Sequence, residues 1–114
     1  MKKMICMGYF TGATGQSMGM FYFGEGLVAG ADVGGIRYDG KLVEQPDGAL
    51  VGQVKLIVPP GTEIITGLVA GQQQQEITAQ ISLPKRFAET GQVVRIDTPA
   101  GPVTARFEVL RELP

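Results

Sequence analysis

Hydrophobic and polar residues alternate along much of the chain, a pattern typical of half-buried β-strands because successive strand side chains point to opposite faces. The longest run extends from Leu50 to Val58, where every even-numbered position is glycine or aliphatic. Together with shorter apolar runs, this pattern predicts eight strands and no long helix. The predicted strands are residues 4–10, 17–23, 27–31, 36–43, 50–58, 77–83, 93–98 and 103–110.

Clusters of glycine, proline and aspartate separate these strands and favour tight connections. Residues 24–26, Gly-Glu-Gly, predict a hairpin turn in which the two flanking glycines supply the positive φ angles. Residues 44–48, Glu-Gln-Pro-Asp-Gly, give the clearest turn signal. The segments 11–15 and 99–102 are of the same kind, so most strands are expected to be joined by short links.

In two segments, 62–70 and 85–91, hydrophobic and polar residues do not alternate regularly. Prolines 59 and 60 end the fifth predicted strand, because proline cannot donate to a sheet ladder. Residues 62–70 are apolar but irregular, and three interpretations stay open: a loop across a barrel mouth, a short helical turn, or an added strand. Residues 85–91 predict one helical turn that ends at Gly91.

Four glycines between positions 28 and 40 bear on the shape of the sheet. Glycine inside a strand costs roughly 0.5–1 kcal/mol relative to alanine, so Gly30, Gly34, Gly35 and Gly40 are expected to mark corners. Sequential strands are usually neighbours, and pairing the first strand with the last removes both open edges. The sequence therefore predicts an all-β, eight-stranded antiparallel up-and-down β-barrel in a single domain, 1–114, with a sandwich as the alternative.

Of the 114 residues, 44% are hydrophobic and 18% are charged, a composition that is typical of a compact protein. A net charge of −1 provides no attraction for nucleic-acid phosphates. No apolar stretch approaches the roughly 18–20 residues that cross a bilayer, and the opening residues lack the apolar run of a signal peptide. We expect a cytoplasmic protein with no membrane or nucleic-acid partner. Cys6, the only cysteine, is expected to be a buried or edge thiol, with an intermolecular or reactive thiol as the alternative.

The chain contains no histidine, which removes the Ser-His-Asp triad, a histidine base and the usual zinc and haem sites. Asp32 and Asp39 offer a carboxylate pair, but the simpler interpretation is that they satisfy backbone amides in turns or at a rim. Residues 12–15 match the Gly-x-x-Gly sequence of an RNA-binding loop. That loop needs flanking helices, whereas this segment joins two predicted strands, so a hairpin turn is the simpler interpretation. No catalytic residue, metal or cofactor is expected.

An eight-stranded barrel has an interior that is either filled by side chains or holds one small ligand. Methionine and aromatic residues between positions 18 and 23 are candidates to line such a cavity, although a packed core is the simpler interpretation. The candidate ligand-binding residues are Met18, Met20, Tyr22, Tyr38 and Phe107.

A series of glycine-aromatic and Asp-Gly elements extends over nearly the whole chain. It comprises Gly8-Tyr9, Gly30-Ala31-Asp32, Tyr38-Asp39-Gly40, Asp47-Gly48, the strand 50–58 and Pro60-Gly61. This series resembles the GrlR-like family of small bacterial proteins, named for a negative regulator of a type three secretion system. The resemblance implies a lipocalin-like, or calycin-like, eight-stranded barrel that commonly forms a homodimer.

In that regulator an acidic surface loop contacts the transcriptional activator that it restrains. The equivalent loop here is 44–48, which has fewer carboxylates and so leaves the specific partner open. Within it, Glu44, Gln45 and Asp47 are the candidate partner-binding residues.

Three functions follow from these observations, in descending order of preference. The first is a non-enzymatic protein that acts by protein–protein interaction, with a regulatory role in transcription or secretion. The alternative is a barrel that binds a small apolar molecule or lipid in its interior. The third is an enzyme that uses Tyr, Asp, Glu and Arg, as some barrel-shaped cyclases do. The interior volume of the barrel separates the first two.

Overall fold

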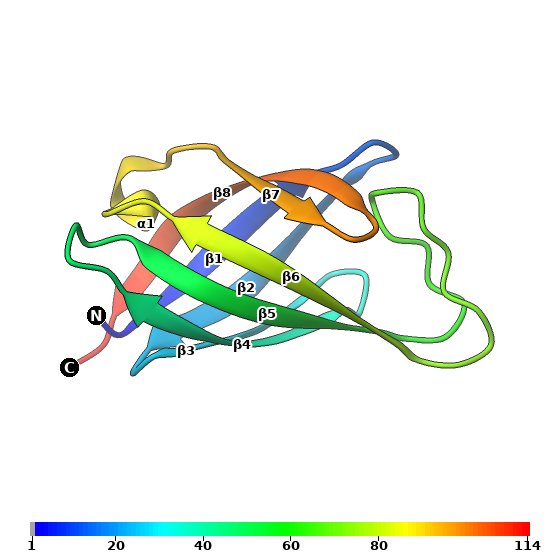
Figure 1. The fold of residues 1–114 in the computed structure, drawn as a ribbon, viewed down its shortest axis with the longest axis horizontal. Helices are drawn as coiled ribbons and strands as arrows, with labels where there is room; N and C mark the ends of the chain where they lie inside the picture. The colour runs from blue at the N-terminus through cyan, green and yellow to red at the C-terminus, as the bar shows by residue number, and fades with distance from the viewer. Residues whose placement is uncertain (1) are drawn as a thin grey trace.

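The computed structural model describes residues 2–114; Met1, which the predicted domain includes, lies outside the described residues. Eight antiparallel strands form one sheet that curls into a nearly closed barrel (Figure 1), so the predicted all-β barrel is confirmed. The elements are β1 (Met4–Thr11), β2 (Gln16–Gly24), β3 (Leu27–Asp32), β4 (Arg37–Glu44), β5 (Leu50–Val58), β6 (Gln75–Leu83), α1 (Phe87–Thr90), β7 (Val94–Thr98) and β8 (Gly101–Glu112).

The first and last strands pair, as predicted. β1 forms an antiparallel ladder with β8 from Met4 opposite Glu112 to Thr11 opposite Thr104, with one irregularity between Ile5 and Cys6. The hydrogen-bonded order of the sheet begins at β6 and ends at β7. The barrel is therefore interrupted along one line, where β6 and β7 lie next to each other without a ladder in the described part of the chain.

Glycine allows the sheet to bend where neighbouring strands approach closely. A side chain at Gly40 would collide with the backbone oxygen of Gln53, so this predicted corner is a point of close strand contact. The hairpin between β2 and β3 differs from the prediction in detail. Glu25 and Gly26 have the positive φ angles, 55° and 76°, whereas Gly24 does not. A two-residue turn of this kind requires positive φ at both central residues, which here include a glutamate.

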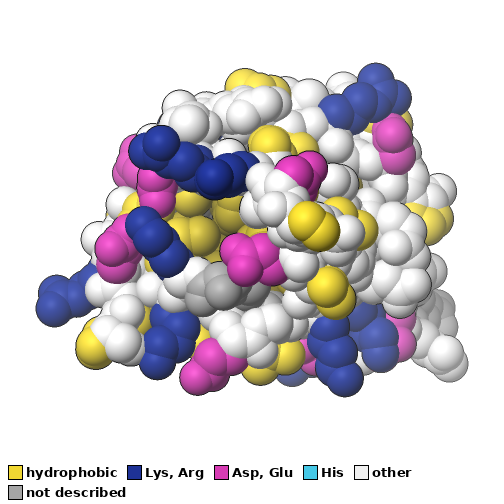
Figure 2. All heavy atoms as spheres, turned by 60° about the vertical axis from the view of Figure 1, so that its left-hand side comes forward, with side chains coloured by type: hydrophobic (Ala, Val, Ile, Leu, Met, Phe, Trp, Pro, Cys, Tyr) yellow, Lys and Arg dark blue, Asp and Glu magenta, His cyan; other side chains and the backbone are white. Residues whose placement is uncertain are grey.

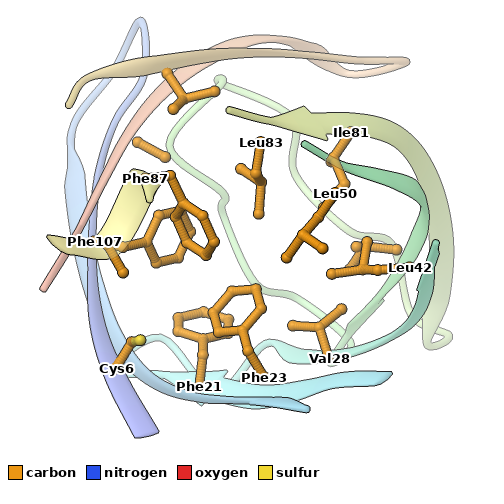
Figure 3. Close-up of a cluster of buried hydrophobic side chains, with 14 of the residues drawn as sticks. Cys6, Phe21, Phe23, Val28, Leu42, Leu50, Ile81, Leu83, Phe87 and Phe107 are labelled. Atoms are coloured by element: carbon orange, nitrogen blue, oxygen red, sulfur yellow. The ribbon is translucent and has the colours of Figure 1, made fainter. Parts of the chain in front are cut away.

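The core consists of inward-facing side chains from all around the sheet. Figure 3 shows aromatic side chains gathered on one side of the interior and aliphatic side chains on the other. The labelled members are Phe21, Phe23, Phe87 and Phe107 among the aromatics, and Val28, Leu42, Leu50, Ile81 and Leu83 among the aliphatics.

Two smaller predictions are also confirmed. The single helical turn α1 is followed by Gly91 at a φ of 65°. Cys6 is a buried free thiol, and burial raises its pKa to about 11.

Residues 59–74 form a loop that crosses one end of the barrel, opposite the end where the termini lie (Figure 1). Within it the chain doubles back on itself, since Gly61 N donates to Gly71 O and Ala70 N donates to Thr62 O, each at 2.8 Å. A single bridge joins Glu63 to Val69. Of the three interpretations of residues 62–70, the loop across a barrel mouth is therefore correct.

This loop has a small hydrophobic core of its own. Buried Ile64 and Ala70 pack with Val58 and Ile77 from the adjoining strands and with Ile36, which directly precedes β4. In the described residues, no helix is both long and apolar enough to span a membrane.

Candidate functional site

A cavity of about 250 Å³ lies inside the barrel at the end crossed by the loop 59–74. Inward-facing residues of the strands form its walls, and residues 62–66 of the loop lie across its end. The lining residues that are also exposed to solvent mark the opening; they are Gln16, Val33, Gly34 and Glu63. The barrel interior is thus not completely filled by its own side chains.

One wall of the cavity is aromatic. The rings of Phe10, Phe21, Tyr38 and Phe107 contact one another with centroid distances of 5.0–6.0 Å. These rings lie over Gly8, where an added Cβ would come within 2.9–3.0 Å of three of them. The absence of a side chain at Gly8 therefore makes the room in which the aromatic rings pack.

The opposite wall is aliphatic and comes mainly from β5 and β6. Val54 and Ala79 are ladder partners that both face inward, and Leu56 and Ile81 lie on either side of them in the lining. Because Ala79 is small and almost fully buried, it borders the open space without filling it.

Tyr38 and Asp32 form a hydrogen-bonded pair near the mouth of the cavity. The Tyr38 hydroxyl donates to Asp32 Oδ2 at 2.7 Å, while Asp32 Oδ1 accepts from the backbone N–H of Gly34 at 2.9 Å and of Ile36 at 3.1 Å. Burial, reinforced by the Asp32 charge and the hydrogen bond to it, raises the pKa of Tyr38 well above its ordinary value. Tyr38 therefore stays protonated and remains a donor.

The loop is held over the mouth by contacts with the β1–β2 turn. Both the backbone N–H and the hydroxyl of Thr14 donate to Ile65 O, at 2.8 and 3.0 Å. A side chain at Gly12 would collide with the same carbonyl. The neighbouring Thr66 lines the cavity with a buried hydroxyl oxygen that has no hydrogen-bond partner within residues 2–114.

The charged residues of the lining are both acidic. Asp32 and Glu63 contribute carboxylates near the mouth, and no Lys or Arg of the described chain lines the cavity. The site thus combines an apolar interior with polar groups at the mouth and a negative potential.

The structure separates the five candidate ligand-binding residues into two groups. Tyr38 and Phe107 line the cavity, whereas Met18, Met20 and Tyr22 lie on the outer face of β2 and do not. Their placement as lining residues needs correction, because strand alternation turns their neighbours inward instead. The inward residues of that strand are Phe21 and Phe23.

The candidate partner-binding residues lie at the other end of the barrel, in the turn between β4 and β5. Gln45 N donates to Ala49 O at 2.7 Å, and Asp47 Oδ1 accepts from Ala49 N at 2.9 Å. Asp47 thus stabilises its own turn. Glu44, the last residue of β4, is exposed to solvent.

Figure 2 shows charged side chains gathered around a hollow with an apolar floor. A second cavity, of about 190 Å³, lies at this end of the barrel. Lys2, Lys85 and Glu89 are among its charged lining residues, and Leu50 and Phe87 are among its apolar ones. It is therefore more polar at its rim than the cavity at the loop end.

The structure does not bring Asp32 and Asp39 together as a site. Asp39 is exposed on the outer face of β4, while Asp32 fulfils the predicted role of satisfying backbone amides in a turn. No group of three or more His, Cys, Asp or Glu side chains in the described chain is placed to hold a metal ion.

The loop residues of the site, Ile64, Ile65 and Thr66, were not identified from the sequence. Their segment has no clear pattern of hydrophobic and polar positions, and it is placed over the mouth by contacts distant in sequence, such as those of Thr14, about fifty positions earlier. Comparisons with protein-family models, with curated proteins and with solved structures found no match.

Proposed function

We propose that the barrel binds one small, largely apolar molecule in the cavity beneath the loop 59–74. The observation that carries this proposal is the cavity itself, which is surrounded by aromatic and aliphatic side chains and opens at one end. Concave apolar sites with a few polar groups are the usual form of small-molecule sites. A scaffold that acted only through its surface would have no need of this space.

The volume limits the size of the ligand. An apolar cavity of about 150 Å³ holds benzene, so the 250 Å³ observed here accommodates a molecule of roughly ten non-hydrogen atoms. This is below the range of about 300–1,000 Å³ that is typical for drug-sized ligands. The proposed ligand is therefore a single or fused ring, or a short chain, rather than a long lipid.

The polar groups limit its charge. Asp32 and Glu63 at the mouth disfavour an anion, since no basic residue of the described lining offsets them. The same carboxylates can accept a hydrogen bond from a hydroxyl group on the ligand. A neutral molecule with one hydroxyl group fits this arrangement better than a carboxylate does.

Fluorescence titration with 2-naphthol tests the proposal, with 2-naphthoate as the anionic counterpart. We expect 2-naphthol to bind and 2-naphthoate to bind at least about tenfold more weakly, a difference of about 1.4 kcal/mol. Absence of 2-naphthol binding at any soluble concentration would count against the proposed function. Preference for the anion would contradict the assignment of ligand charge.

A cavity-filling variant gives the matched control. Ala79→Leu places three more carbon atoms in the cavity. Thr78→Leu introduces the same leucine side chain at the preceding residue of β6, which lies on the exposed outer face. We expect Ala79→Leu to weaken 2-naphthol binding at least about tenfold and Thr78→Leu to leave it unchanged. Equal effects from both variants would show that the probe binds elsewhere.

The protein–protein role remains a prediction supported by the resemblance to the GrlR-like family. A partner bound at Glu44, Gln45 and Asp47 and a cytoplasmic location remain predictions of the same kind. Ligand binding in the interior is compatible with such a role, because the cavity and this turn lie at opposite ends of the barrel.

A further inference from the structure

Charges of the two signs are distributed unevenly between the two ends of the barrel. The chain has 10 basic and 11 acidic residues, so an extensive lining is expected to contain both signs. The charged lining residues of the second cavity are of both signs: Lys2, Lys85, Arg86, Glu44 and Glu89. Among the described residues, the cavity beneath the loop 59–74 has only the carboxylates of Asp32 and Glu63. The charge at its mouth is therefore not offset within the lining.

Neither of these two carboxylates has a cationic partner. Asp32 and Glu63 form no ion pair with another residue of 2–114. Asp32 accepts hydrogen bonds from two backbone N–H groups and from the Tyr38 hydroxyl, which hold the carboxylate in place without neutralising it. Glu63 is exposed to solvent in the loop. Two like charges without a counter-ion produce a negative potential that attracts a cation.

Contacts at the loop end bring the two carboxylates to the same region of the mouth. The backbone N–H of Ile36 donates to Asp32 Oδ1 at 3.1 Å. Ile64, the residue that follows Glu63, packs in the same small hydrophobic cluster as Ile36. One positively charged group at the mouth is therefore attracted by both carboxylates.

Aromatic rings lie directly behind Asp32. The ring of Tyr38, whose hydroxyl is 2.7 Å from Asp32 Oδ2, has its centroid 5.0 Å from that of Phe21 and 6.0 Å from that of Phe10. Figure 3 shows Phe21 and Phe107 pointing into the interior. The face of an aromatic ring is negative and attracts a cation within about 6 Å. The rings and the carboxylates thus favour the same sign of ligand charge.

We propose that the ligand of this cavity is a protonated arylalkylamine, with its ring in the apolar interior and its ammonium group at the mouth beside Asp32 and Glu63. This inference rests on the proposed function, because it requires the cavity to hold a ligand. An alkylamine is protonated at pH 7, as the lysine amine is. At the mouth the ammonium group keeps part of its hydration, so binding avoids the large cost of burying an isolated charge.

Three probes that share the naphthalene ring test the charge of the ligand. They are the cation 2-naphthylmethylamine, the neutral 2-naphthylmethanol and the anion 2-naphthoate. Fluorescence titration should show the amine binding at least about fivefold more tightly than the alcohol, and the alcohol more tightly than the anion. An alcohol that binds as tightly as the amine would overturn this inference and leave the proposed function intact. Binding of none of the three would overturn both.

A variant of the loop tests where the amine binds. Glu63→Gln removes one charge but keeps the size of the side chain, so it should weaken binding of the amine at least about twofold and leave binding of the alcohol unchanged. Glu108→Gln is the matched control, since Glu108 is exposed on the outer face of β8 and does not line the cavity. Equal losses of amine binding from the two variants would show that the general surface charge attracts the amine, which would overturn the inference.

Salt gives a second test that needs no substitution. The preference of the wild-type protein for the amine over the alcohol should shrink when NaCl is raised from about 20 mM to about 500 mM, because salt screens charges that are accessible to solvent. Binding of the alcohol should not change in this way, since it carries no charge. A preference for the amine that is independent of salt would contradict the role of the two carboxylates.

Discussion

Eight residue pairs join β1 to β2 and another eight join β1 to β8, whereas no ladder of the described chain joins β6 to β7. On the first side, ladders join β1 to both neighbouring strands and three aromatic rings pack over Gly8. On the second side, the side chains that line the cavity are mainly aliphatic. The comparison indicates that the β1–β8 side contributes more to the stability of the fold than the side on which the ladder is missing, although both sides line the cavity.

The largest expected effect comes from removing an aromatic ring on the β1–β8 side. Phe107 is 4% exposed and contacts Phe10, Phe21, Phe23 and Phe87. Phe107→Ala should lower the free energy of unfolding by about 3–5 kcal/mol, measured by urea denaturation.

The half-buried Ile96 on β7 provides the contrast to Phe107. Ile96→Ala should have a clearly smaller effect on the free energy of unfolding, because this side chain is smaller than a phenylalanine and only half-buried. Equal losses from the two variants would remove the distinction between the two halves.

The second effect tests the packing of rings over Gly8. Gly8→Ala should destabilise the protein by about 1–3 kcal/mol, because the added methyl group overpacks three aromatic rings. Gly71→Ala is the matched control, since a Cβ there meets no atom within 4 Å. If thermal unfolding shows both variants to be as stable as the wild type, the rings do not pack on this glycine.

A smaller effect is expected at the mouth of the cavity. Tyr38→Phe removes the hydroxyl that donates to Asp32 and should lower the free energy of unfolding by about 1 kcal/mol. The variant keeps the aromatic ring, so binding of 2-naphthol should persist. Loss of binding without loss of stability would instead indicate that the hydroxyl contacts the ligand directly.

The last effect concerns pH. Burial raises the pKa of Cys6 from 9.0 to about 11, so the folded state favours the neutral thiol. The resulting contribution to stability is complete below pH 9 and is lost as the pH rises from 9 to about 11. The raised pKa of Tyr38 acts in the same direction.

Unfolding curves of the wild type and of Cys6→Ala, recorded between pH 7 and about 11, isolate the thiol contribution. We expect the stability of the wild type to fall more steeply above pH 9 than that of the variant. Parallel curves would show that the thiol is not shielded from water in the folded protein.

Most of the fold could be predicted from local patterns. Alternation from Leu50 to Val58 reproduces β5 residue for residue, and proline 84 ends β6 because it cannot donate to a ladder. The missing ladder between β6 and β7 could not be predicted, because it depends on how far the closed side of the sheet twists. The position of the turn between β2 and β3 was predicted, but the positive φ of Glu25, which is not a glycine, was not.

The site was predicted less well, for a physical reason that lies in β2. Residues 18–23 are apolar at every position except Gly19, so hydrophobicity alone does not show which of them face inward. The structure places Phe21 and Phe23 inside and Met18, Met20 and Tyr22 outside.

The central claim is that the barrel encloses space for a small apolar molecule, and a crystal structure under xenon pressure tests it most directly. Xenon occupies apolar cavities of this size without requiring polar partners. The account predicts a xenon atom in contact with Val54, Ala79 and Ile81 in the wild-type protein, and none there in Ala79→Leu. A wild-type interior in which side chains close this space, with no xenon bound, would contradict it.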